Sequence, residues 1–140
     1  MIKELNHDEE FLAQVAEPAT AEDANVAQDL VDTLLSIKDE CAGLAANMIG
    51  VNKAIICFFN TSDKVVVMYN PRMTWKTGLY KAQEGCMSLE RETVCNRYRR
   101  IKVVYQELVD GELVECEKTY RDWLAEVIQH EVDHCKGVLV

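Results

Sequence analysis

The chain contains little proline, little glycine and no long apolar run. Its 140 residues include only two prolines, Pro18 and Pro71, and six glycines, so no segment has the composition of a flexible linker. No stretch approaches the roughly 18 consecutive apolar residues of a membrane-spanning helix, and residues 1–11 lack the apolar core of a signal peptide. We therefore expect a single domain, residues 1–140, that works in the cytoplasm without a membrane.

Positive charge is also scarce. The 24 acidic residues outnumber the 15 basic ones, which gives a formal net charge of −9. Such an excess repels nucleic-acid phosphates, so DNA is not an expected partner. The one basic run, RYRRIK (97–102), is either a contact surface or an edge strand protected by its charges. The six cysteines are expected to be free thiols or metal ligands in a reducing compartment.

The first half of the chain predicts one helix and one hairpin. Thr20 and Asp23 have the spacing of a capping box, and the apolar residues that follow recur at helical spacing, which predicts a helix over about 21–39. The β-rich runs 54–59 and 64–70, separated by a turn-like segment, predict a hairpin.

The second half predicts another hairpin and a final helix. Asp110-Gly111 favours a tight turn between two extended runs. A second capping-box pattern at Thr119 and Asp122 predicts a helix that continues to about Cys135, with Gly137 as its stop. Without alternating βαβ units, the order of elements indicates an α+β fold in which antiparallel β-sheets pack around the C-terminal helix.

The stretch QHEVDH (129–134) carries the strongest chemical signal. On a helix, His130 and His134 lie one turn apart and can hold one metal ion, while Glu131 can move a proton of a water at that ion. The alternative is an ordinary polar face of a helix. A catalytic site needs about three protein ligands, and His7 in its acidic segment is a poor third.

Cysteine is the better candidate for the third ligand. Cys135 directly follows His134, so helical geometry turns it away from the face that the histidines share. Cys86, in QEGCMSL, follows a glycine that permits a bend and lies shortly before a small polar residue, Ser88, a setting that suits the presentation of a thiolate from a strand edge. The alternative for Cys86 is a buried structural cysteine.

Three stretches together resemble the peptide deformylases. GLAANMIG (43–50), EGCMSL (84–89) and QHEVDH (129–134) occur in the family's order, and the last two match its patterns E-G-C-x-S and H-E-x-x-H without a break. The resemblance implies a hydrolase of protein biosynthesis that removes the formyl group from the N-terminal methionine of nascent proteins.

The resemblance also implies the site. Its metal ligands would be Cys86, His130 and His134, holding Fe²⁺ in the cell, with Zn²⁺, Ni²⁺ or Co²⁺ able to substitute. Glu131 would be the general base and acid, and the backbone N–H of Met87 would point at the developing oxyanion. Nascent formylated peptides, and the ribosome transiently, would be the partners.

The first stretch departs from the family pattern G-x-G-x-A-A-x-Q. Cys41 replaces the first glycine, and Met48 stands at the position of the glutamine, whose amide helps to bind the formyl oxygen. A thioether cannot donate a hydrogen bond. Reduced activity is therefore expected, and the alternative is a homologue that binds metal and N-terminal peptides without useful turnover. The amino-terminal segment before Thr20 is also expected to differ from the family, and the chain stops at Val140, soon after the metal helix.

The resemblance places the remaining candidate residues against the peptide substrate. The loop residues Gly43 and Leu44 would lie along the peptide, and Arg97 would contact its backbone. Trp123, Glu126 and Val127 lie near the metal-binding face of the helix, where the family builds an apolar methionine pocket. Glu126 suits such a pocket poorly, so a weakened methionine preference is expected unless Glu126 extends into solvent.

Overall fold

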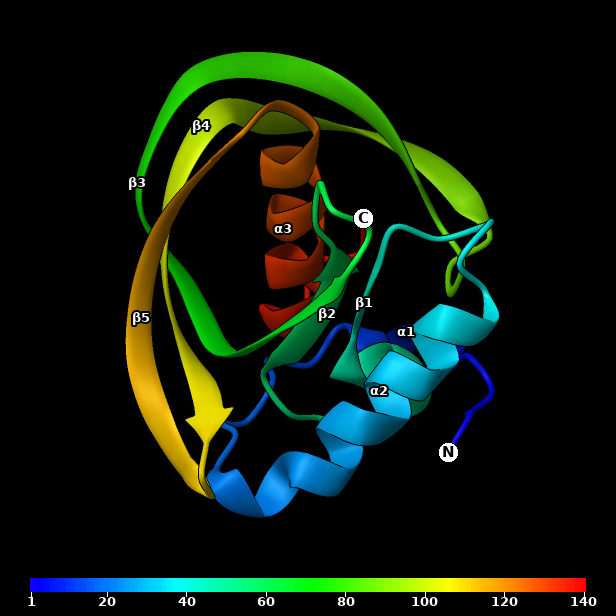
Figure 1. The fold of residues 1–140 in the computed structure, drawn as a ribbon. Coiled ribbons are helices and arrows are strands. Elements are labelled where there is room, and N and C mark those ends of the chain that lie inside the picture. Colours follow the sequence, from blue (N-terminus) through cyan, green and yellow to red (C-terminus); the bar gives the residue numbers. More distant parts are fainter.

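The computed structural model describes residues 1–140 as three α-helices and five strands. In chain order these are α1 (Glu9–Leu12), α2 (Ala24–Ser36), β1 (Gly43–Ala45), β2 (Ile55–Phe59), β3 (Val65–Cys86), β4 (Arg91–Val109), β5 (Glu112–Arg121) and α3 (Asp122–Cys135). The strands form one antiparallel sheet in the order β1-β2-β3-β4-β5, which curves around α3 (Figure 1). The predicted α+β architecture around a C-terminal helix is confirmed.

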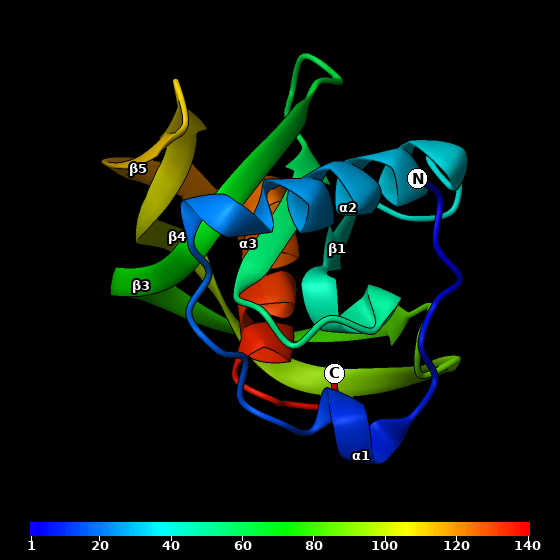
Figure 2. The same cartoon turned by 90° about the horizontal axis from the view of Figure 1, so that it is seen from below.

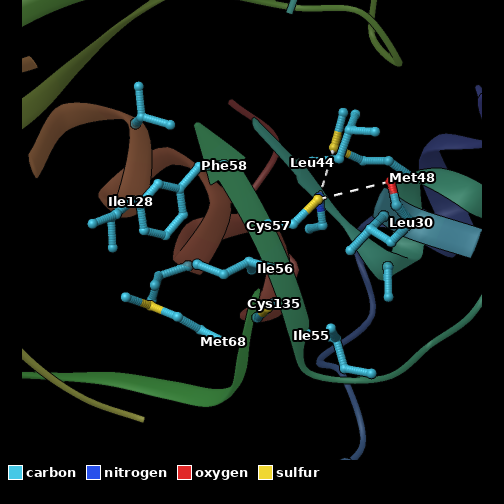
Figure 3. Packing of buried hydrophobic residues seen from close by; sticks show 14 of the residues in the cluster. Leu30, Leu44, Met48, Ile55, Ile56, Cys57, Phe58, Met68, Ile128 and Cys135 are labelled. Atoms are coloured by element: carbon cyan, nitrogen blue, oxygen red, sulfur yellow. Dashed lines mark hydrogen bonds between the residues drawn. The ribbon is translucent and has the colours of Figure 1, made fainter. Parts of the chain in front are cut away.

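Strand β2 is buried on both faces, which explains its uninterrupted apolar sequence IICFF. Phe58 and Ile56 face Ile128 of α3, whereas Cys57 faces Leu30 of α2 (Figure 3). Successive side chains of a strand point to opposite faces, so a strand covered on both sides needs apolar residues at every position. Helix α2 therefore covers the face of β2 that α3 does not (Figure 2).

Strand β3, the second strand of the first predicted hairpin, is much longer than the sequence predicts. The predicted pairing of residues 54–59 with 64–70 is confirmed, but β3 then continues through Pro71 to Cys86. Its register against β4 shifts between Tyr69 and Arg72. A proline cannot donate a ladder hydrogen bond, and an irregularity in the pairing is a position where that donor is not required. The extension carries the Cys86 stretch to the far end of a long hairpin.

The predicted β4–β5 turn is confirmed. Asp110 and Gly111 have φ values of 51° and 82°, the left-handed geometry of a two-residue hairpin turn. The paired strands on either side run from Val109 and Glu112 to Arg100 and Arg121.

The first predicted capping box is also confirmed, although its helix ends early. The Thr20 N–H donates to Asp23 Oδ2 at 2.8 Å, and Thr20 Oγ1 accepts from the Glu22 N–H at 3.2 Å. One 3₁₀ turn, Ala21–Asp23, leads into α2, which ends at Ser36 rather than near residue 39.

The second predicted capping box is wrong. Thr119 lies in β5 opposite Lys102, and α3 begins after Arg121 without a side-chain cap. Pairing with β4 holds this segment extended up to Arg121, so tertiary contacts override the local capping signal. The predicted stop is correct: Gly137 has a φ of 74°, and an added Cβ would lie 2.4 Å from the Ala13 carbonyl oxygen.

None of the helices combines the length and the apolar character needed to cross a bilayer.

Candidate metal centre and active site

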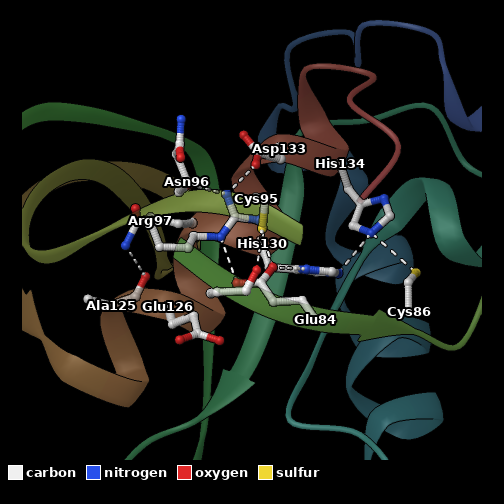
Figure 4. Close-up of polar contacts among 12 residues, drawn as sticks. Glu84, Cys86, Cys95, Asn96, Arg97, Ala125, Glu126, His130, Asp133 and His134 are labelled. Carbon is white, nitrogen blue, oxygen red and sulfur yellow. Dashed lines mark hydrogen bonds and ion pairs between the residues drawn. The ribbon is translucent and has the colours of Figure 1, made fainter. Parts of the chain in front are cut away.

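Helix α3 and the end of β3 bring two imidazoles and a thiol together in the interior. His134 Nε2 lies 3.2 Å from His130 Nε2 and 3.4 Å from Cys86 Sγ (Figure 4). The three ligand atoms all lie within 4.8 Å of one another, and all three residues are buried. The histidines come from successive turns of α3, whereas the cysteine comes from a strand distant in sequence.

This donor set fits a tetrahedral metal ion. Metal–nitrogen and metal–sulfur bonds of about 2.0–2.3 Å imply ligand–ligand separations of roughly 3.3–3.6 Å. The separations of 3.2 and 3.4 Å around His134 agree with this geometry. Three protein ligands leave one coordination position for water or substrate, as in catalytic sites. His7 lies outside this cluster, with Nδ1 2.6 Å from the Ser88 carbonyl oxygen.

A buried ion-pair network orients His130. Glu84 Oε1 lies 2.7 Å from His130 Nδ1, and both oxygens of the same carboxylate accept from Arg97, at 2.7 and 2.8 Å. Arg97 Nη1 also donates to Asp133 Oδ2 at 2.7 Å. Because Nδ1 is held by Glu84, the Nε2 atom of His130 faces Cys86 and His134, which is the usual role of a carboxylate behind a ligating histidine.

The network also sets the charges at the centre. Burial alone would raise the pKa of Glu84, but hydrogen bonds from His130 and Arg97 lower it to about 2. Burial lowers the pKa of His130, but hydrogen bonds with Cys86 and Glu84 raise it to about 10. For His134, burial and then the charges of His130 and Arg97 lower the pKa to about 3. The surroundings of His130 thus favour a positive charge at its ring. A divalent metal ion bound at the site would supply such a charge.

Glu131 lines the same cleft as Cys86 and His130, and one oxygen of its carboxylate is free. Its side chain is 4% exposed, and Oε1 has no hydrogen-bond partner. Burial raises the pKa of Glu131 to about 7, close to the value at which a carboxylate both accepts and returns a proton. Gly43 makes room for it, because a Cβ there would lie 3.3 Å from Glu131 Cγ and 3.0 Å from the Cys57 carbonyl oxygen.

A cleft of about 970 Å³ opens onto this centre. It runs between the loop that follows α2 and the β3–β4 hairpin, with α3 beneath. Most of the residues predicted from the sequence line it: Gly43, Met48, Cys86, Met87, Trp123, Glu126, Val127, His130 and Glu131. Leu44 does not line it, because its side chain is buried in the core.

Arg97 differs from its sequence prediction. Arg97 is buried, 4% exposed, and its guanidinium is held by Glu84 and Asp133, so it does not line the cleft where a peptide backbone would lie. The charged run 97–102 therefore mixes one buried network residue with exposed ones such as Arg99 and Arg100. Strand periodicity gave no sign of this, because the partners Glu84 and Asp133 are distant in sequence.

Met48 contributes no hydrogen-bond donor to the cleft. It is 2% exposed, and its Sδ accepts from the Ala45 N–H at 3.4 Å, which closes the short 3₁₀ turn of this loop. The sequence reasoning missed the neighbouring Asn47, whose Nδ2 donates to the His134 carbonyl oxygen at 2.9 Å. It also missed Tyr80, whose hydroxyl donates to Glu126 Oε1 at 2.7 Å. Neither residue lies in a motif that would have indicated its role.

Replacement of Glu84 by glutamine should weaken metal binding about 10- to 100-fold, because the neutral amide no longer offsets the charge on Arg97 or supports His130. Competition with a chelator measures the affinity. Asp133→Asn is the matched control, since it also disturbs Arg97 but leaves the Glu84–His130 contact in place. Equal losses in both variants would show that the contact with His130 has no special part in metal binding.

Comparisons with known proteins agree with this site. A family model described as polypeptide deformylase matches residues 2–140, which includes the amino-terminal segment that the sequence reasoning had expected to depart from the family. The peptide deformylase of Clostridium beijerinckii is 39% identical over 140 residues, 100% of each chain. Peptide deformylase 3 of Shewanella oneidensis is 32% identical over 92% of this chain and 80% of its own.

Solved structures give the same result. The peptide deformylase of Thermus thermophilus superimposes with a TM-score of 0.85 at 29% identity, covering 99% of this chain and 83% of that one. A class I type b peptide deformylase from Acinetobacter baumannii with Met-Ala-Ser bound has a TM-score of 0.83 at 25% identity, covering 99% and 97%. Together with the cysteine, two histidines and glutamate at the centre, these matches show that the chain belongs to the polypeptide deformylase family.

Proposed function

We propose that the protein is a metallohydrolase that removes the N-terminal formyl group from formyl-methionyl peptides of nascent proteins. The observation that supports this most directly is the meeting of Cys86, His130 and His134 behind a cleft that Cys86, His130 and Glu131 line, with Glu131 Oε1 free of any partner. The alternative of a homologue that binds peptides without turnover is not favoured, because ligands, acid–base group and cleft are all in place.

The ion held by Cys86, His130 and His134 would supply Lewis-acid activation of a water molecule. The free oxygen of Glu131 is placed to accept the proton of the attacking water. Glu131 then gives that proton to the amine nitrogen as the bond between the formyl carbon and that nitrogen breaks, which releases formate and a free peptide amine. A carboxylate with a pKa of about 7 suits both halves of this transfer.

The developing negative charge on the formyl oxygen needs hydrogen-bond donors. Met87 lines the cleft immediately after Cys86, and we assign its backbone N–H to this role. Met48, at the position where the family has glutamine, adds no second donor, and loss of one such donor typically costs about 10²–10³ in rate. We therefore propose a deformylase that is slower than one with the glutamine.

The peptide chain fits along the cleft beside Gly43. Strand β1 is at the edge of the sheet and pairs only with β2, and Gly43 at its start lines the cleft, whereas Leu44 is 0% exposed. We propose that an extended peptide lies beside Gly43, along the outer side of this edge strand. The A. baumannii structure with Met-Ala-Ser bound supports an occupant of this kind. We do not assign Arg97 to peptide binding, because Glu84 and Asp133 hold it away from the cleft.

The pocket for the first side chain would be formed by Trp123, Glu126 and Val127. Val127 is buried, Trp123 is exposed at the rim, and Glu126 is half-buried and held by Tyr80. Because that hydrogen bond fixes the carboxylate in the cleft wall, we propose that the pocket favours methionine less than an all-apolar pocket would.

We further propose that the metal is Fe²⁺ in the cell. A thiolate with two imidazoles accepts Fe²⁺, Zn²⁺, Ni²⁺ or Co²⁺, so availability rather than the donor set would decide. Because formylated chains are made by ribosomes in the cytoplasm, we place the protein there, where it would meet the ribosome transiently.

Glu131→Gln should abolish formate release from a formyl-methionyl peptide, with a loss of at least about 10²-fold, because the amide cannot accept the water's proton. Protein loaded anaerobically with iron or nickel is used, because a thiolate-bound ferrous site is prone to oxidation. Metal content is measured in parallel as the control. Full activity in a metal-replete variant would remove Glu131 from the mechanism.

Met48→Gln should raise kcat by about tenfold or more, because the amide supplies the missing donor to the formyl oxygen. Met48→Leu is the matched control: it has similar size but offers no donor, and it should not raise kcat. If the two variants have the same kcat, the formyl oxygen is not bound from position 48.

Glu126→Leu should increase the preference for methionine at the first position. A panel of formyl peptides that differ only in their first residue gives the ratio of kcat/KM for methionine over alanine. We expect this ratio to rise severalfold. An added apolar contact in a pocket can change the discrimination between two substrates by at most about 10–200-fold. Tyr80→Phe, which only frees the Glu126 carboxylate, should change the ratio less. A strong methionine preference in the unmodified protein would contradict the proposed role of Glu126.

A further inference from the structure

Residues 3–8 form an N-terminal arm that contacts two loops of the active site. The Asn6 N–H donates to the Met48 carbonyl oxygen at 2.7 Å, and His7 Nδ1 lies 2.6 Å from the Ser88 carbonyl oxygen. The arm passes the tip of the β3–β4 hairpin before it reaches α1 (Figure 2). Asn6 thus joins the arm to the 3₁₀ turn after β1, and His7 joins it to the turn between β3 and β4. No step of the proposed mechanism yet uses His7.

The contact with Ser88 is a hydrogen bond that His7 donates. A carbonyl oxygen carries no proton, so the proton of this bond belongs to His7 Nδ1. No backbone N–H donates to the Ser88 carbonyl oxygen, and Ser88 is 1% exposed. A buried carbonyl without a partner is unfavourable. The Ser88 carbonyl therefore depends on His7.

The turn that His7 contacts carries the proposed oxyanion donor. Glu90 N–H donates to the Cys86 carbonyl oxygen at 2.8 Å. That carbonyl and the Met87 N–H belong to one planar trans peptide unit, so they point in opposite directions. The bond from Glu90 therefore directs the Met87 N–H away from the interior of the turn, and Met87 lines the cleft.

This turn needs support from outside. Glu90 has a φ of 54°, a left-handed conformation that persists in residues other than glycine where surrounding contacts hold it. Two contacts reach the turn and its end from the start of the chain: the bond from His7 to Ser88, and an ion pair between Glu9 Oε1 and Arg91 Nη1 at 2.9 Å. Of these two, the bond from His7 is the one that holds the backbone of the turn.

We propose that His7 is a positioning residue for deformylation, acting through the turn that presents the Met87 N–H. This inference rests on the proposed function, in which that N–H binds the developing oxyanion. By holding the Ser88 carbonyl, His7 keeps the turn in the conformation that directs the Met87 N–H at the formyl oxygen. Because Met48 supplies no second donor, the direction of this single N–H has a large effect on the rate.

The effect should appear in kcat rather than in KM. A hydrogen bond to the formyl oxygen strengthens as negative charge develops there, so a misdirected donor destabilises the transition state more than the bound substrate. Complete loss of one oxyanion donor costs about 10²–10³ in rate, and a displaced donor keeps part of its effect, so we expect a loss of about tenfold.

His7→Leu, which removes the donor, should lower kcat for a formyl-methionyl peptide about tenfold and leave KM within about twofold of its value in the unmodified protein. His7→Asn tests rescue, because its amide nitrogen is bonded to Cγ as Nδ1 is in histidine and can donate to the same carbonyl. It should restore most of the lost kcat. Amide hydrogen exchange gives a readout independent of activity: residues 87–90 should exchange faster in His7→Leu than in His7→Asn.

Glu9→Gln is the matched control. It removes the ion pair with Arg91 at the end of the same segment but leaves the bond from His7 in place. This variant should keep the kcat and the exchange rates of the unmodified protein. Metal content, measured in every variant, should stay the same, because no ligand is changed. A loss of metal from His7→Leu that matches its loss of kcat would overturn the proposal, since His7 would then support the ligand Cys86 instead.

The remaining outcomes separate this proposal from the function on which it rests. An unchanged kcat in His7→Leu overturns the positioning role and leaves the deformylase function intact. So does a His7→Asn variant as slow as His7→Leu, because a donor at position 7 would then be irrelevant. An equal loss of kcat in Glu9→Gln also overturns it, because attachment of the arm rather than the bond to Ser88 would be responsible. Release of no formate by the metal-loaded unmodified protein overturns the proposed function, and this proposal with it.

Discussion

The site depends on the buried ion pairs that the Glu84 carboxylate forms with His130 and Arg97. This carboxylate joins β3 to α3 through His130, and β3 to β4 through Arg97, all in the interior. Removing one partner of such a buried ion pair leaves the other charge uncompensated and lowers the stability of the fold by about 3–5 kcal/mol. One residue therefore holds the metal-binding helix in register with the strand that carries Cys86, and it turns the His130 ring toward the site.

The same arrangement explains why residues of the cleft walls can be replaced without loss of the metal centre. The ligands and Glu131 are buried residues of α3 and the end of β3, whereas Met48, Glu126 and the exposed Asp39, Glu40 and Glu90 belong to the cleft walls. Met48 packs into its own loop through the Ala45 N–H, so the fold does not require a glutamine there. Changes in the walls thus alter donors and charge around the substrate while the metal geometry stays the same.

Much of the site was predicted from local patterns, and the misses have a common cause. His130, Glu131 and His134 lie on one helix, whose periodicity fixes their relation, and the family resemblance supplied Cys86. The family resemblance assigned Arg97 to the peptide backbone; its partners in the structure, Glu84 and Asp133, come from another strand and from α3. Similarly, Thr119 has a capping pattern, but pairing with Lys102 keeps it in a strand.

The sequence by itself determined the α+β class, the β2–β3 and β4–β5 turns, the helical spacing of the histidines and the stop at Gly137, because each depends on residues a few positions apart. Tertiary structure decided that β3 continues through Pro71, that Gly43 packs closely against Cys57 and Glu131, and that Glu84 orients His130. It also gathered Asp39, Glu40, Glu90 and Glu92 around one cleft. These features depend on the approach of segments distant in sequence, which no local pattern encodes.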